Sequence, residues 1–352
     1  MKLDEIVSNI RPLVEDAQEK AWKRWDSLTK PRKSLGRLEE IVVQLAGIRG
    51  DPSPKINKKA IVIMVGDHGI VKRGVSAYPQ EVTVQMVRNF LNGGAGINAI
   101  ASRANAEVFV VDVGIAHPVE FNHPSFRNYN VRHGTNDFSQ EPAMTRDEAI
   151  KCIEVGIQMA EELDKMKIDI VGTGEMGIGN TTPSTAILSV FAKDVSLDSI
   201  VGAGTGLDKE GIKKKRTVIS EAIRLHKPNP NDPIDVLEKV GGLEIGAIAG
   251  LVIGCAYLRK PVVIDGFIST VGALLAYKIT PDVLPYIIPS HLSQEPGHKI
   301  ALDQMGLRSM LTLDMRLGEG TGSAIGMIII DCALNAYYNM LTFEEAGVSK
   351  GE

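Results

Sequence analysis

The sequence predicts an α/β fold with a doubly wound, mostly parallel sheet and a smaller helical domain built from both ends of the chain. Three observations support this prediction: short β-branched runs that stop at Gly or Asp-Gly, helical stretches between these runs, and chain ends without strand signals. Parallel strands are buried on both faces and are therefore continuously apolar, and alternation of strands with helices is typical of a doubly wound sheet. We expect ligands to bind beyond the carboxyl ends of the strands.

Each expected element follows from its own pattern. Residues 1–50 contain two helices joined by residues 30–33, because apolar side chains recur there at helical spacing. Strands are expected at residues 60–65, 108–113, 168–171 and 261–264, and helices at 81–92, 146–165, 182–191, 211–225, 245–258 and 324–340. The expected domains are residues 1–57 (N-terminal helices of the small domain), 58–310 (large α/β domain) and 311–352 (a catalytic loop and the C-terminal helix of the small domain).

Composition excludes several classes of protein. The 39 basic and 43 acidic residues give a formal net charge of −4, which supplies no positive field for nucleic acid. The 3 cysteines have no close spacing, so we expect no disulfide framework and a reducing, cytoplasmic location. The longest apolar run, residues 245–258, is shorter than the roughly 20 residues that span a bilayer. We expect this run to be a buried helix, and no membrane span.

The glycine-rich segment 172–177 has two interpretations. It matches the dinucleotide fingerprint GxGxxG after a predicted strand, which favours a nicotinamide-dinucleotide oxidoreductase as the alternative function. However, Glu175 would then face a pyrophosphate, and the helix is expected to begin only at Thr182 and Pro183. We therefore expect the glycines to form a turn that shapes a pocket for Glu175, or else a tight turn with a solvated Glu175.

A second glycine-rich loop, residues 202–208, leads into a helix that carries Lys213, Lys214, Lys215 and Arg216. Backbone N–H groups at a helix start, together with nearby cations, form a site for one phosphate group. The alternative is a loop before a solvated basic helix face, which is the usual role of a charge run.

A third loop places Glu319 between Gly318 and Gly320, just before an apolar helix. Desolvation of such a carboxylate raises its pKa toward the range of a general base. The alternative is a glutamate that interacts only with the helix dipole. His68, His291 and His298 lack metal-ligand spacing such as HExxH, so we expect hydrogen-bonded structural histidines and no metal.

Several longer motifs occur in these loops and elsewhere along the chain. They are Lys30-Pro31, Ser34-Leu-Gly-Arg-Leu-Glu39, Asp67-His-Gly69, Gly74-Val-Ser-Ala-Tyr-Pro79, Gly174-Glu-Met-Gly-Ile-Gly-Asn-Thr-Thr-Pro183, Asp265-Gly-Phe267, Pro289-Ser-His-Leu292 and Met315-Arg-Leu-Gly-Glu-Gly320. Together they resemble a known enzyme family, the nicotinate-nucleotide:dimethylbenzimidazole phosphoribosyltransferases of cobamide assembly. The resemblance covers nearly the whole chain, in order. One departure is Lys33, where the family commonly has Gly.

The resemblance implies a Rossmann-like large domain and an enzyme without a cofactor or metal. Such an enzyme moves phosphoribose from nicotinate mononucleotide to a cobamide lower-ligand base and forms an α-ribotide and nicotinate. The base is 5,6-dimethylbenzimidazole and, in relatives that activate phenols, phenol or p-cresol. The resemblance also implies a homodimer, or a heterodimer with a paralogous chain.

The resemblance assigns roles to residues by motif. Glu319 corresponds to the general base, and Glu175 corresponds to a second active-site carboxylate. Tyr78, Met86 and Leu317 are expected to contact the base. The residues expected to bind phosphate and ribose are Gly177, Asn180, Thr181, Gly202, Gly204, Thr205 and Lys215, although the sequence does not decide which of the lysines 213–215 contacts phosphate.

Overall fold

The computed structural model describes residues 2–349, and at its centre is a six-stranded parallel sheet. The strand order is β3-β2-β1-β4-β5-β6, so the order reverses between β1 and β4, where doubly wound sheets bind ligands. The strands are β1 (Lys59–Gly66), β2 (Ala106–Gly114), β3 (Phe126–Asn128), β4 (Ile170–Met176), β5 (Val262–Ile264) and β6 (Ile287–Pro289), and a separate parallel pair consists of β7 (His291–Leu292) and β8 (Leu311–Thr312).

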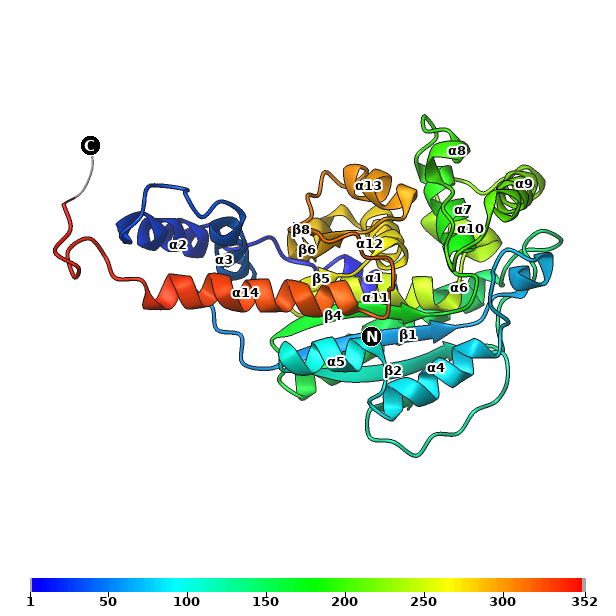
Figure 1. The fold of residues 1–352 in the computed structure, drawn as a ribbon, viewed down its shortest axis with the longest axis horizontal. Coiled ribbons are helices and arrows are strands. Elements are labelled where there is room, and N and C mark those ends of the chain that lie inside the picture. The colour runs from blue at the N-terminus through cyan, green and yellow to red at the C-terminus, as the bar shows by residue number, and fades with distance from the viewer. Residues whose placement is uncertain (1, 350–352) are drawn as a thin grey trace.

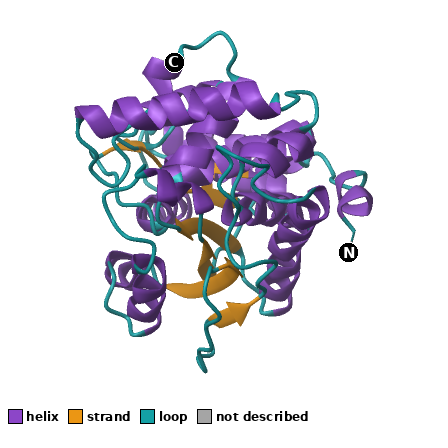
Figure 2. Ribbon diagram, turned by 90° about the vertical axis from the view of Figure 1, so that its right-hand side faces the viewer, coloured by secondary structure: helices purple, strands orange, loops and turns teal. Residues whose placement is uncertain are grey.

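Helices cover both faces of the large sheet, which confirms the predicted α/β class (Figures 1 and 2). Arg146–Lys165 was predicted with its observed bounds. The helices are α1 (Leu3–Val7), α2 (Glu15–Ser27), α3 (Arg37–Arg49), α4 (Val82–Leu91), α5 (Gly96–Arg103), α6 (Arg146–Lys165), α7 (Thr181–Phe191), α8 (Leu197–Ile200), α9 (Lys209–His226), α10 (Pro233–Val240), α11 (Leu243–Tyr257), α12 (Phe267–Ile279), α13 (Pro296–Asp303) and α14 (Thr321–Asn339).

The alternation of side chains along β1 divides the core into two layers. Ala60, Val62 and Met64 point to the layer that contains α6, α11 and α12. Ile61 and Ile63 point to the opposite layer, which contains α3, α5 and α14. Every residue of β1 is buried, as expected for a central parallel strand. The apolar run 245–258 is the buried helix α11, as predicted, and no helix of residues 2–349 meets the length and hydropathy that a membrane span requires.

Both chain ends contribute to a helical group beside the sheet. Helices α2 and α3 lie next to the C-terminal half of α14 (Figure 1), and the Trp25 and Tyr337 rings are in edge contact with centroids 5.0 Å apart. Helix α1 instead packs on α6 and α11. The division into a small and a large domain stays a prediction. Lys33, the departure from the family pattern, has a φ of +59°, a conformation that glycine adopts most easily.

Strand β4 corrects one prediction. The strand was expected to end at residue 171 and the glycines to form a turn, but β4 continues to Met176 in register with β1. Gly172 and Gly174 are therefore strand residues. A Cβ atom on Gly174 would lie 2.5 Å from the backbone oxygen of Glu319, so glycine is required for the close approach of the Glu319 loop to β4.

Candidate active site

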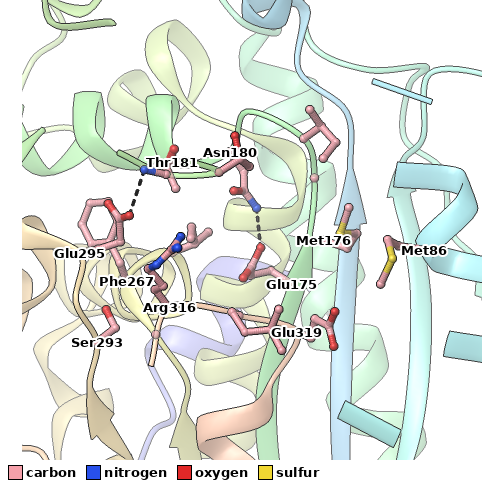
Figure 3. A pocket seen from close by; sticks show the side chains of 18 of the residues that line it. Met86, Glu175, Met176, Asn180, Thr181, Phe267, Ser293, Glu295, Arg316 and Glu319 are labelled. Atoms are coloured by element: carbon pink, nitrogen blue, oxygen red, sulfur yellow. Dashed lines mark hydrogen bonds between the residues drawn. The ribbon is translucent and has the colours of Figure 1, made fainter. Parts of the chain in front are cut away.

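A cavity of about 450 Å³ lies at the carboxyl ends of β4, β5 and β6 (Figure 3). Its position is the one that doubly wound sheets use for ligands. Ten of the twelve predicted site residues line it, and the other two, Gly202 and Lys215, are adjacent to lining residues: Lys215 donates to Thr181, and Gly202 lies against Glu295. The ten are Tyr78, Met86, Glu175, Gly177, Asn180, Thr181, Gly204, Thr205, Leu317 and Glu319.

Glu175 is the next-to-last residue of β4, and its side chain points into the cavity (Figure 3). Asn180, which precedes α7, donates a hydrogen bond from Nδ2 to Glu175 Oε2. Burial, with the nearby charge of Asp265 as the next cause, raises the pKa of Glu175 to about 8. The alternative of a solvated Glu175 is wrong, because only 6% of the residue is exposed.

Glu319 reaches the same cavity from the turn before α14. Its φ is +63°, and the flanking Gly318 and Gly320 have φ values of +82° and +98°, so three consecutive residues are left-handed. Glu319 Oε2 accepts a hydrogen bond of 3.1 Å from the backbone N–H of Ile97, the second residue of α5. Burial raises the pKa of Glu319, in the direction that the sequence predicts.

Asp265, directly after β5, holds the Glu319 turn in place. Its Oδ2 accepts from Gly320 N at 2.9 Å, and its Oδ1 accepts from Gly322 N at 2.7 Å. A side chain from another element thereby caps the N-terminus of α14. Burial raises the pKa of Asp265 to about 7, against these backbone hydrogen bonds.

One corner of the cavity is suited to an anion. The N-terminus of α7 carries no side-chain cap, and Thr181, its first residue, accepts a hydrogen bond of 2.6 Å from Lys215 Nζ. Of the three lysines only Lys215 is buried, while Lys213 and Lys214 are exposed. Burial lowers the pKa of Lys215 to about 8. The geometry thus favours Lys215 among the three candidates.

The start of α9 was predicted to supply the backbone N–H groups of the phosphate site, and the structure corrects this. Asp208 caps α9 by accepting from Gly211 N at 2.8 Å, so this helix start already has an anionic partner. Glu295 occupies the adjacent glycine loop, where its Oε1 accepts from Gly204 N at 3.0 Å. A Cβ atom on Gly202 would lie 2.0 Å from Glu295 Oε2, so Gly202 makes room for this carboxylate.

The opposite side of the cavity is apolar. Met86 of α4 and Met176 at the end of β4 lie there (Figure 3), and Tyr78 and Leu317 are at the mouth, both more than half exposed. Thr205 connects this wall to the glycine loop, because its Oγ1 lies 3.1 Å from Ser76 Oγ and accepts from Ala77 N. A flat aromatic ring fits such a wall.

The histidines have different positions. His298 is a buried structural group, as expected: its Nδ1 accepts from Ser293 N at 2.9 Å, and its Nε2 lies 2.9 Å from Thr270 Oγ1. His68 forms a buried pair with Glu244 at 2.8 Å, behind the cavity. His291, also expected to be structural, lines the cavity. Residues 2–349 contain no group of three or more ligands suited to a metal ion.

Several lining residues were not assigned by sequence reasoning. Phe267, His291 and Arg316 lie in the quoted motifs, yet nothing in their spacing indicated a role. Glu295 gave only a weak signal, a carboxylate directly before Pro296 at a helix start. Asp265 follows a strand of a parallel sheet, which was a usable signal for a site residue.

The comparisons with known proteins agree with this geometry. A family model described as Phosphoribosyltransferase (DBI_PRT) matches residues 10–348. The chain belongs to this phosphoribosyltransferase family. It is 49% identical over 348 residues to the nicotinate-nucleotide–dimethylbenzimidazole phosphoribosyltransferase of Dehalococcoides mccartyi, covering 99% of this chain and 98% of the relative. It is 48% identical over 350 residues to the protein of that name in Geobacter sulfurreducens, covering 99% of each.

A solved structure supports the same family for this phosphoribosyltransferase. The crystal structure of CobT from Thermus thermophilus matches with a TM-score of 0.90 and 42% identity, over 96% of this chain and 100% of the other. The family match and the position of Gly172 and Gly174 inside β4 leave the oxidoreductase alternative without support. The chain is therefore an enzyme of the pentosyltransferase class.

Proposed function

We propose that this phosphoribosyltransferase moves phosphoribose from nicotinate mononucleotide to 5,6-dimethylbenzimidazole and releases nicotinate. The observation that carries the proposal is that Glu175 and Glu319 face one cavity, between an anion corner at Lys215 and an apolar wall at Met86. The names of the relatives support the two substrates.

The first part of the reaction is departure of nicotinate from the anomeric carbon of the ribose. The electron pair of the C–N bond goes to the ring nitrogen, so positive charge moves from the pyridinium to the sugar. Glu175 stabilises this charge as a carboxylate. Its pKa near 8 belongs to the free enzyme, and a cationic substrate lowers the pKa of a neighbouring carboxyl group.

The second part is attack by a ring nitrogen of the base, whose other nitrogen must lose a proton. Glu319 accepts this proton. Ile97 N fixes one carboxylate oxygen of Glu319 and leaves the other available, while Asp265 fixes the turn. A positioned general base contributes about 10² to 10⁴ in rate, and the raised pKa of Glu319 makes it a stronger base than an exposed glutamate.

The phosphate is bound at the corner formed by Thr181 and Lys215. Lys215 supplies the charge and the uncapped start of α7 supplies backbone N–H groups, with Gly177 and Asn180 beside them. Anchoring the phosphate holds the ribose for attack from the face opposite to the leaving group. This arrangement requires neither a cofactor nor a metal.

Phenol and p-cresol are further proposed acceptors, because a phenol hydroxyl presents Glu319 with a proton as a benzimidazole N–H does. Tyr78 and Met86 support this, since an aromatic face and a flexible thioether accept more than one ring. A dimer of this chain, or a pair with a paralogous chain, stays a prediction.

The proposal is tested by incubating the enzyme with nicotinate mononucleotide and, separately, dimethylbenzimidazole, adenine, phenol or no base. Chromatography then follows nicotinate and the ribotide. We expect nicotinate release to require a base and to match ribotide formation mole for mole. Release at the same rate without a base would identify a hydrolase and contradict the proposal.

A further inference from the structure

Arg316 is an exposed cation without a protein partner at the edge of a cavity rich in carboxylates. It is the only Lys or Arg among the residues 2–349 that line the cavity, and its guanidinium forms no hydrogen bond or ion pair in this part of the chain. Glu175, Glu295 and Glu319 line the same space. The proposed mechanism uses the two glutamates, the anion corner at Lys215 and the apolar wall at Met86, but it gives Arg316 no role.

The direction of the Arg316 side chain indicates what it meets. In Figure 3 Arg316 and Phe267 lie on one side of Glu175, whereas Met86 and Glu319 lie on the other. Nicotinate mononucleotide is a β-nucleotide and the proposed product is an α-ribotide, so the configuration at the anomeric carbon inverts. The leaving ring and the incoming base must then lie on opposite sides of the ribose, which places the nicotinate ring next to Phe267 and Arg316.

From these positions we infer that Arg316 binds the carboxylate of the nicotinate ring and makes the enzyme select nicotinate mononucleotide over nicotinamide mononucleotide. This inference rests on the proposed function and adds the recognition of the leaving group.

The chemistry of the two groups agrees with this role. The negative charges of three nearby glutamates repel a nicotinate carboxylate unless a cation pairs with it. The planar guanidinium of arginine forms two parallel hydrogen bonds to a carboxylate, whereas the carboxamide of nicotinamide offers one acceptor and no charge. The Phe267 ring on the same side suits a pyridinium, because aromatic faces attract cations.

The phosphate of the substrate is the other anion that Arg316 could meet. Lys215 and the start of α7 already form a corner for it. Ligands that carry only one of the two anions separate these cases, so the test uses nicotinate, nicotinamide and inorganic phosphate as individual probes.

The experiment measures the dissociation constants of these three probes by calorimetry for the wild type, Arg316→Ala and Arg316→Lys. Arg308→Ala is the control, because Arg308 is an exposed arginine whose partner is Glu40 on α3. We expect the wild type to prefer nicotinate over nicotinamide. Arg316→Ala should weaken nicotinate about 10- to 100-fold, as expected for loss of hydrogen bonds to a charged group, and leave nicotinamide and phosphate unchanged. Arg316→Lys should be intermediate, and Arg308→Ala should bind all three like the wild type.

Four outcomes would overturn the inference: a wild type without preference for nicotinate, unchanged nicotinate binding in Arg316→Ala, equal weakening of nicotinate and nicotinamide, or weakening of phosphate alone. Turnover of nicotinate mononucleotide with dimethylbenzimidazole by the wild type is measured in parallel. Absence of turnover contradicts the proposed function, whereas turnover with an unchanged preference in Arg316→Ala contradicts only the role of Arg316.

Discussion

Glu175 and Glu319, two of the three glutamates that line the cavity, belong to very different structural elements. Glu175 belongs to β4, a strand paired on both sides, and its backbone is in register with Met64 of β1. Glu319 belongs to a turn of three left-handed residues. This turn depends on its hydrogen bonds to Asp265 and on the absence of a side chain at Gly174, which lets it approach β4. Both glutamates are more than nine-tenths buried, so burial alone does not distinguish them.

Their surroundings separate their chemistry. Glu175 is close to another carboxylate, Asp265, and its pKa reaches about 8. Glu319 is affected mainly by burial and by one backbone donor, Ile97. A bound cation should therefore change the ionisation of Glu175, which lies beside a second acid, more than that of Glu319. Glu319 is the better candidate for a carboxylate that stays ionised at neutral pH and can accept a proton. The presence of a second acid therefore gives two identical side chains different acid–base properties, as the two proposed roles require.

The largest expected effect is on Glu319→Gln. The amide keeps the shape of the side chain and the acceptor for Ile97 N, but it cannot take a proton. We expect kcat to fall by about 10² or more while KM for nicotinate mononucleotide changes little. Steady-state kinetics with dimethylbenzimidazole measure this, and wild-type turnover would remove Glu319 from the role of general base.

The next largest effect tests whether phosphate binding by Lys215 is separate from the catalytic roles proposed for the two glutamates. Lys215→Ala should raise KM for nicotinate mononucleotide about 10- to 100-fold, more than KM for the base, because a charged hydrogen-bond donor to the phosphate is lost. Lys214→Ala is the matched control from the same helix, since Lys214 is exposed. Equal, small effects of both variants would mean a solvated basic face without a phosphate site.

A third prediction concerns the pKa of Glu175. At neutral pH this group is mostly protonated in the free enzyme, so Glu175→Gln should lower kcat/KM only about tenfold. The wild-type kcat/KM should rise with pH below about 8, where Glu175 loses its proton, and fall above it, where Lys215 loses its charge; the variant should lack the rise. The pH profiles of both proteins, with Glu221→Gln as an exposed control, measure the difference.

The raised pKa of Glu175 also predicts how the stability of the protein depends on pH. The pKa of Glu175 is higher in the folded state than in the unfolded state. At pH values between these two pKa values the unfolded state binds fewer protons, so the free energy of unfolding of the wild type falls as pH rises toward 8. Glu175→Gln should remove this loss and gain more over the wild type at about pH 8 than at about pH 5. Unfolding in urea at both pH values measures it. A variant that changes only stability, with wild-type turnover, would make Glu175 a structural residue.

The sequence predicted those features that depend on local pattern. Residues 60–65 and 146–165 have uninterrupted strand and helix periodicity, and they correspond to β1 and α6. The extension of β4 through Gly172 and Gly174 was missed, because both glycines are required by segments far along the chain. The backbone of Glu319 and Gly320 packs on Gly174, and the Ser323 side chain of α14 packs on Gly172. Contacts between distant segments leave no periodicity in either segment.

The same distinction holds for the site. Motifs predicted Glu175 and Glu319 as site residues, and both line the cavity, but the partners that set their geometry were not assigned. Asp265 acts on Gly320 and Gly322, and Glu295 acts on Gly204, across separations that only the sheet brings together. Ordinary carboxylates in loops carry no local sign that two backbone N–H groups from another element will bind them.

The smallest expected effect concerns the apolar wall, whose Met86 and Met176 lie on the same side of Glu175 as Glu319 (Figure 3). The double variant Tyr78→Ser with Met86→Gln makes this wall smaller and more polar without touching either glutamate. A small ring such as phenol depends on close packing, so the variant should lower the ratio of phenol to dimethylbenzimidazole use by about three- to fivefold. Product formation with phenol, p-cresol and dimethylbenzimidazole gives this ratio. Leu225→Ser is the control, because Leu225 is an apolar residue of similar exposure on α9. A ratio equal to that of the wild type would show that Tyr78 and Met86 do not select the base, and specificity would then belong to the Glu319 turn itself, through Leu317.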